Sequence, residues 1–86
     1  MAWKKVNYGD TLRNGVKGDP VCALQRTLNS SGFGRPRLKV DGLFGGATEH
    51  AVRWFQGFNQ LKVDGIVGPK TWRELRGGYG LKPTKC

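Results

Sequence analysis

Six acidic residues, one histidine and two cysteines are the side chains of this sequence that could do acid–base or metal chemistry. Asp41 and Asp64 each precede a glycine in a repeated Asp-Gly pair, as in calcium-binding loops. A calcium loop also needs oxygen ligands at alternating positions before its glycine. In both copies the two residues before the aspartate are Lys and Val. We therefore interpret both aspartates as turn-capping residues, and we predict no metal site and no cofactor.

Glycoside hydrolysis would need two carboxyl groups that converge on one bond. Glu49 and Glu74 are the helical candidates, and nothing in their spacing brings them together. His50 lies outside the apolar stripe of its segment, which indicates a surface residue. The sequence therefore predicts no catalytic residue, and we expect a binding protein that is not an enzyme.

The composition favours one small domain with an anionic partner. The chain has 86 residues, with 15 Lys and Arg against six Asp and Glu, and a formal net charge of +9. Such a charge suits nucleic acid, an acidic membrane surface or a bacterial wall, and a solvated basic surface without a dedicated partner is the plain alternative. No apolar run reaches the roughly 18 residues of a membrane span. Cys22 and Cys86 match no metal-ligand spacing, and their pairing stays open.

An internal duplication organises the chain. Residues 38–52 read LKVDGLFGGATEHAV, and residues 61–75 read LKVDGIVGPKTWREL. The first copy starts at residue 38 and the second at residue 61, an offset of 23. An Asp-Gly pair suits a turn, and Gly-Pro in the second copy suits the start of a helix. The repeated unit is therefore predicted to be a tight loop that leads into a helix.

Three helices are predicted around these loops. The first spans Asp19–Asn29, with Asp19 as its N-cap; the second spans about Gly46–Asn59, and the third runs from Pro69 to about Arg76. The apolar stripe of the second helix is Ala47, Ala51, Val52, Phe55 and Phe58. The predicted fold class is all-α, a small three-helix bundle with an internal loop–helix duplication. We expect an N-terminal extension over 1–11, the domain over 12–76, and a flexible tail or linker over 77–86.

Three motifs resemble the type 1 peptidoglycan-binding domain. They read LRxGxxGxxVxxLQxxL from residue 12, DGxFGxxTxxAVxxFQ from residue 41, and LxxDGxVGPxTWxxL from residue 61. The resemblance implies a three-helix module that attaches wall-lytic or wall-modifying enzymes to peptidoglycan, as in phage endolysins. Gly46 and Gln60 depart from the family's usual Pro and Gly, so Asn59 is expected to supply the left-handed residue that ends the second helix.

Peptidoglycan binding is predicted in a shallow groove beside the two repeated loops. Such a site should combine backbone donors, an Asp or Thr, and an aromatic ring. The candidate ligand-binding residues are Asp41, Gly42, Phe44, Gly45, Thr48, Trp54, Thr71 and Trp72. Phe44 fits the core by pattern, Trp72 is expected to be half-buried with a free indole N–H, and Trp54 is a candidate exposed ring for stacking on a sugar.

Two other functions fit the same features. A nucleic-acid-binding helical module would use the basic charge, although the exposed face of the second helix lacks a dense row of Arg, Lys, Asn or Gln. A protein-interaction or propeptide-like domain could keep the fold without binding glycan. We expect a monomer that acts at the bacterial cell wall or periplasm. The sequence begins without a visible signal peptide, so phage release at lysis or membership of a longer protein would bring it there.

Overall fold

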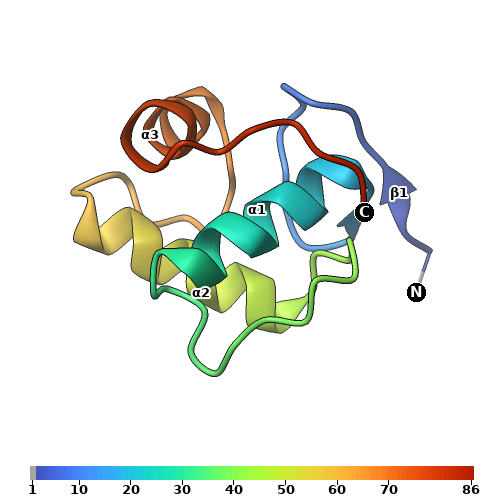
Figure 1. Ribbon diagram of the computed structural model, residues 1–86, viewed down its shortest axis with the longest axis horizontal. Helices are drawn as coiled ribbons and strands as arrows, with labels where there is room; N and C mark the ends of the chain where they lie inside the picture. The colour runs from blue at the N-terminus through green and yellow to red at the C-terminus, as the bar shows by residue number, and fades with distance from the viewer. Residues whose placement is uncertain (1) are drawn as a thin grey trace.

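The computed structural model describes residues 2–86 and contains three helices and one very small sheet (Figure 1). The elements are β1 (Lys4–Lys5), β2 (Val16–Lys17), α1 (Asp19–Ser30), α2 (Gly46–Phe58) and α3 (Pro69–Tyr79). The two strands pair in parallel, with Lys4 opposite Val16. The predicted class, a mainly helical small domain with three helices, is confirmed.

The core lies where the apolar faces of the three helices meet. Its fully buried side chains include Leu24 and Leu28 of α1, Phe55 of α2 and Leu75 of α3. Phe58 was predicted to belong to this core, and that prediction is wrong because the side chain is 69% exposed. It is the last residue of α2, and its ring packs against Phe33, which follows α1, at 5.5 Å between centroids while most of it stays exposed.

The start of α1 and the end of α3 differ from the predicted ones. The N-cap of α1 is Gly18, and Asp19 is already helical. The third helix continues through two glycines to Tyr79, whose ring packs on Phe55 at 4.9 Å between centroids. This tertiary contact outweighs the low helix propensity of glycine. The helix then ends at Gly80, which is left-handed with φ 70°, a common way for helices to end.

The end of α2 also differs from the expectation. Asn59 has φ −94°, and Gln60 takes the left-handed conformation with φ 59°. Asn59 instead uses its side chain, which donates to the Phe55 carbonyl at 2.9 Å and accepts from the Tyr79 hydroxyl at 3.0 Å. A non-glycine residue therefore holds a position that favours glycine.

The N-terminal segment ties the two repeated loops together. Phe44 N–H donates to the Val16 carbonyl at 3.0 Å in the first loop. At the equivalent position of the second loop, Val67 and Leu12 exchange two backbone hydrogen bonds of 2.8 and 3.1 Å. Val6, which precedes Leu12 in the same N-terminal segment, is buried in the core. The segment thus bridges both copies of the duplication.

The C-terminal segment is fastened to the bundle, which differs from the flexible tail expected there. It leaves α3 and runs back across α1 toward β1 (Figure 1). Leu81 is buried, and the Tyr8 hydroxyl donates to the Thr84 carbonyl at 2.6 Å. Cys86 forms a disulfide with Cys22 of α1, which settles the pairing that the sequence left open. The sequence could not indicate these contacts because their partners lie more than 60 residues away.

Candidate functional site

A buried glutamine anchors each repeated loop. Gln25 of α1 donates from Nε2 to Asp41 Oδ1 at 3.2 Å, to the Leu43 carbonyl at 3.0 Å and to Thr48 Oγ1 at 3.1 Å. Its Oε1 accepts the backbone N–H of Gly42 at 3.0 Å. One side chain therefore holds the turn, the strand-like segment after it and the first turn of α2.

Gln56 of α2 repeats this arrangement in the second copy. Its Nε2 donates to Asp64 Oδ1 at 3.0 Å, to the Ile66 carbonyl at 2.9 Å and to Thr71 Oγ1 at 3.2 Å. Its Oε1 accepts the backbone N–H groups of Asp64 and Gly65 at 3.1 and 2.9 Å. The duplication therefore includes the hydrogen-bond network as well as the loop.

Sequence reasoning assigned no role to these glutamines. Gln25 and Gln56 are both 1% exposed, and each follows an apolar core residue within its helix. The sequence did contain a signal for this role. In two of the motifs a glutamine directly follows an apolar core residue, as the pairs Leu-Gln and Phe-Gln. Buried amides are retained when all their donors and acceptors are paired, as they are here.

The two aspartates cap their own turns, as predicted. Asp41 Oδ1 accepts the Leu43 N–H, and Asp64 Oδ1 accepts the Ile66 N–H, both at 2.9 Å. The hydrogen bond from Ile66 is the largest cause that lowers the pKa of Asp64. Burial opposes it, and Gln56 and Lys62 lower the pKa further. Across residues 2–86 there is no group of three His, Cys, Asp or Glu side chains that could hold a metal ion.

Each repeated loop borders a shallow hollow, here named the first hollow and the second hollow. The second, of about 340 Å³, is lined by Leu61, Lys62, Asp64, Ile66, Gly68, Pro69, Lys70 and Thr71. The first, of about 260 Å³, is lined by the eight residues 23 positions earlier, Leu38, Lys39, Asp41, Leu43, Gly45, Gly46, Ala47 and Thr48, and also by Trp3 and Gln25. The two hollows are therefore copies of one surface.

A helix N-terminus borders each hollow. Gly45 is the N-cap of α2 and Gly68 that of α3, and neither has a side chain that could cap the helix. The backbone N–H groups of a first helical turn have no acceptor within their helix, and the helix dipole makes this end partly positive. Lys39 and Lys62 add a cation to each hollow. The chemistry of both hollows suits carboxylate, carbonyl or hydroxyl oxygens.

The structure brings part of the predicted site together. Asp41, Gly45 and Thr48 line the first hollow, and Thr71 lines the second. The two threonines are 3% and 5% exposed, and their hydroxyls accept from the anchoring glutamines, so they act mainly as scaffold. Phe44 is fully buried, as its pattern indicated.

Gly42 is also buried and has a positive φ of 74°. Its backbone N–H is held by the anchoring glutamine Gln25. Because it does not line either hollow, its contribution to the first loop is the turn itself.

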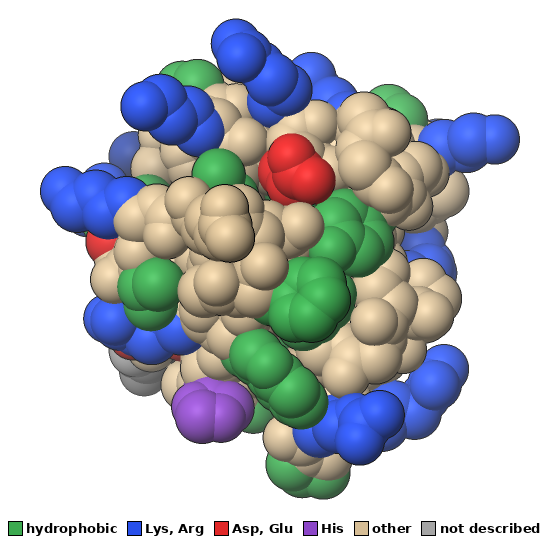
Figure 2. Space-filling view, turned by 90° about the vertical axis from the view of Figure 1, so that its left-hand side faces the viewer, with side chains coloured by type: hydrophobic (Ala, Val, Ile, Leu, Met, Phe, Trp, Pro, Cys, Tyr) green, Lys and Arg blue, Asp and Glu red, His purple; other side chains and the backbone are tan. Residues whose placement is uncertain are grey.

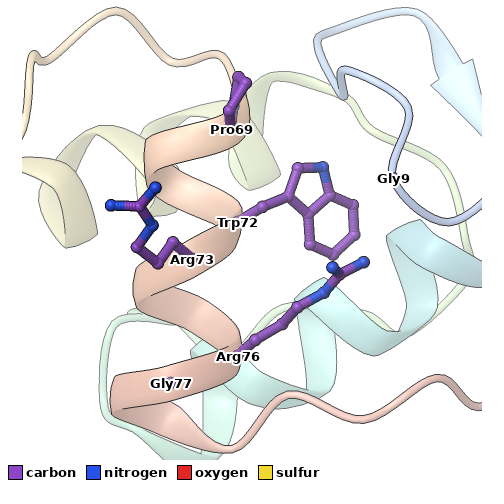
Figure 3. A pocket seen from close by; sticks show the side chains of 6 residues that line it. All are labelled: Gly9, Pro69, Trp72, Arg73, Arg76 and Gly77. Carbon is purple, nitrogen blue, oxygen red and sulfur yellow. The ribbon is translucent and has the colours of Figure 1, made fainter.

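Trp72 differs from its predicted state. It is 4% exposed, and its indole N–H donates to the Asp10 carbonyl at 2.9 Å, so neither a half-buried ring nor a free donor is present. The Arg76 guanidinium lies 4.8 Å from the ring centroid. Figure 3 shows Arg76 reaching along the ring while Arg73 points away from it. Trp72 therefore fixes α3 against the loop at Gly9 and presents little surface to a ligand.

Trp54 is exposed, as predicted, but it lies apart from both loop hollows. Its side chain is 43% exposed and lines a separate hollow together with Phe33, Phe58 and Tyr79. His50 is exposed, and Glu49 forms an ion pair with Arg53 at 3.2 Å. The eight predicted residues thus divide among both loop hollows, the Trp54 surface and the core.

Comparison with known proteins agrees with this geometry. Residues 17–75 match the family described as "Putative peptidoglycan binding domain". A Bacillus licheniformis protein named "Probable N-acetylmuramoyl-L-alanine amidase" is 40% identical over 67 residues, which are 78% of this chain and 19% of that protein. The chain therefore spans about a fifth of the length of this relative.

Two solved structures share the fold. The SleB N-terminal domain superposes with a TM-score of 0.79 at 36% identity, covering 86% of this chain and 99% of that one. The Burkholderia AP3 phage endolysin superposes with a TM-score of 0.73 at 46% identity, covering 80% of this chain and 25% of that one. By its fold and its duplicated loops, the chain belongs to a class of small binding modules. The chain belongs to the peptidoglycan-binding domain family.

Proposed function

We propose that the chain binds bacterial peptidoglycan without catalysis, and that the first hollow is its principal ligand site. The observation that carries this proposal is the duplicated hollow at a helix N-terminus, of which the first copy alone has an aromatic wall, Trp3. Peptidoglycan presents carboxylates, amides and hydroxyls on its stem peptides and sugars. These groups suit unpaired helix donors, a lysine and an aromatic side chain.

The residues of the first hollow then have separate roles. Lys39 attracts a ligand carboxylate, the exposed edge of Asp41 accepts from amide or hydroxyl groups, and the backbone at Gly45 and Gly46 lets a ligand approach the start of α2. Gly42, Phe44 and Thr48 hold the loop, as Thr71 does in the second copy. Trp72 serves binding indirectly by fixing α3.

The same proposal covers the protein's setting. Relatives include a wall amidase, spore cortex-lytic enzymes and an endolysin, so we propose that the domain, within 12–76, directs a linked wall-lytic activity to the wall of a bacterium. A disulfide suits an oxidising location such as the wall or periplasm. We expect the isolated chain to be a monomer without hydrolase activity. No helix in residues 2–86 is long and apolar enough to cross a membrane.

A pair of matched charge reversals tests which hollow binds. Lys39→Glu and Lys62→Glu change equivalent exposed positions and lower the net charge by the same amount. In sedimentation with purified sacculi, Lys39→Glu should weaken binding about tenfold more than Lys62→Glu, about 1.4 kcal/mol. DNA added as a competitor should release little protein.

Three results would oppose the proposal in different ways. Equal weakening by the two variants would mean that net charge, rather than the first hollow, drives attachment. Release of the protein by DNA would favour the nucleic-acid alternative. A wild-type chain that does not sediment with sacculi at all would remove peptidoglycan binding itself.

A further inference from the structure

A second exposed surface lies apart from both loop hollows. It is formed by Trp54 and Phe58 of α2, Phe33 and Arg35 of the α1–α2 connection, and Tyr79 of α3, and is here named the aromatic face. Phe58 is 69% exposed and Trp54 43%, two of the four large exposed apolar side chains among residues 2–86. Figure 2 shows apolar side chains gathered on one face of the molecule, with an acidic group at their edge, the histidine close by and basic groups farther out.

Phe33 holds the aromatic face in a fixed shape. Its ring contacts Trp54 edge-on at 5.9 Å between centroids and Phe58 at 5.5 Å. On its other sides it contacts Phe55 of the core at 5.3 Å and Tyr79 at 5.8 Å. Because Phe33 is itself buried, the exposed rings rest on the core. Edge-to-face packing of this kind is favourable and orients each ring.

Polar groups border the same surface. The rings surround a hollow of about 340 Å³ whose other lining includes Ser31 and Arg35. Arg35 Nε donates to the Gly32 carbonyl at 3.1 Å, and the guanidinium lies 6.0 Å from the Trp54 ring centroid. No acidic residue lines this hollow. The hollow therefore combines aromatic walls with a few polar groups at its edge.

These features select a sugar as the occupant. The C–H groups on one face of a pyranose ring carry partial positive charge and pack on the negative face of an aromatic ring. Hydroxyl or carboxylate groups at the edge of the same sugar could then accept from the guanidinium of Arg35. A purely apolar partner surface would leave Ser31 and Arg35 without such contacts.

We propose that the aromatic face is a second saccharide-binding surface, which takes a sugar ring of an amino-sugar strand on Trp54 and Phe58 with Arg35 at its edge. The proposal rests on the proposed function, since peptidoglycan supplies such a strand. No residue lines both this hollow and the first hollow. Two separate contacts on one polymer would raise overall affinity because the second contact forms within the same complex.

Trp54→Ala, with Trp54→Phe as its matched control, tests this surface. Binding to purified sacculi is measured at high salt, where the general attraction of a basic protein is screened. Trp54→Ala should weaken this salt-resistant binding about tenfold, as expected for loss of one stacking contact, and Trp54→Phe should retain most of it. Phe58→Ala should act in the same direction as Trp54→Ala, and melting curves should show that all three variants remain folded.

A solution measurement locates the contact. On titration with soluble disaccharide–peptide fragments of peptidoglycan, the amide signals of Gly32 and Phe33 and the indole signal of Trp54 should shift. These shifts should persist in Lys39→Glu, which alters only the first hollow. Their persistence would show that the two surfaces bind independently.

The outcomes separate this proposal from the proposed function. If Lys39→Glu weakens binding while Trp54→Ala binds like the wild type, the aromatic face is not a glycan surface and the first hollow stands. If Trp54→Ala weakens binding to single-stranded DNA but not to sacculi, the ligand class proposed here is wrong. If the wild type does not bind sacculi, both proposals fail together.

Discussion

The two loop–helix copies share one internal design and differ in what covers them. Gly42 and Gly65 have nearly the same positive φ, 74° and 72°, and each donates its N–H to an anchoring glutamine. A methyl group added at Gly42 would lie 3.0 Å from the sulfur of Cys86. One added at Gly65 would lie 2.9 Å from Cγ of Glu49. The first turn is therefore covered by the disulfide, and the second by the half-buried side chain of Glu49 of α2.

This difference shows how a duplicated scaffold can acquire one specialised copy. The side-chain hydrogen bonds that shape the loops come from within each repeat and its preceding helix. The features special to the first copy come from outside it: Trp3 from the N-terminal segment and Cys86 from the C-terminus. Both chain ends are thus gathered on the copy that we propose binds the ligand. The predictions below test whether the two copies depend on these different supports.

Loss of the disulfide should have the largest effect and should fall on the first copy. Cys86→Ser removes a cross-link between residues 64 positions apart, which should lower the free energy of unfolding by about 4 kcal/mol. Hydrogen exchange should accelerate more at Gly42 than at Gly65, because the sulfurs cover only the first turn. Reduction of the wild type is the control and should reproduce the effect. Equal acceleration in the two loops would contradict the assigned difference in support.

Loss of an anchoring glutamine should have the next largest effect. Gln25→Met and Gln56→Met keep the side-chain length and leave buried backbone groups without partners, which should cost about 3 kcal/mol each. Gln56 accepts from two backbone N–H groups and Gln25 from one, so Gln56→Met should be the more destabilising. Urea unfolding measures both. A loss below about 1 kcal/mol in either variant would mean that water replaces the amide.

The sequence was sufficient for the elements that depend on local pattern. The repeat predicted both turns, and Asp41 and Asp64 cap them as expected. The starts of α2 and α3 were also predicted at the right residues, because Gly-Pro marks a helix N-terminus and the repeat puts Gly-Gly at the same place in the first copy. Each of these features is decided by residues within a few positions of one another.

The features that the sequence did not predict depend on distant contacts. Helical periodicity places Phe58 on the apolar stripe, but periodicity alone cannot show that its side chain stays 69% exposed. Nothing near Trp72 indicates that Asp10 accepts its indole N–H. The role of Gln25 follows only from its position opposite a loop 16 residues away. The aromatic face likewise requires Phe33, which no helical pattern includes.

The smallest predicted effect concerns a residue just beyond the end of each of two helices. Gly32 is the second residue after α1, with φ 86°, and Gln60 is the second residue after α2, with φ 59°. A left-handed conformation costs a non-glycine residue about 1–2 kcal/mol. Glycine removes this cost, but the greater freedom of its unfolded state offsets part of the resulting stabilisation. Gln60 is exposed, and its replacement removes no buried contact. Gln60→Gly should therefore stabilise the protein by about 1 kcal/mol and raise its Tm by about 5 °C.

Gly32→Gln is the matched reverse substitution. No atom lies within 4 Å of a methyl group added at Gly32, so its cost should be conformational alone. It should destabilise the protein by about as much as Gln60→Gly stabilises it, and if the two effects add, the double variant should have nearly wild-type stability. Calorimetric melting of the three variants measures this. If Gln60→Gly is instead destabilising, the Gln60 side chain makes a contact that offsets its strain, and the two helix ends differ in more than backbone geometry.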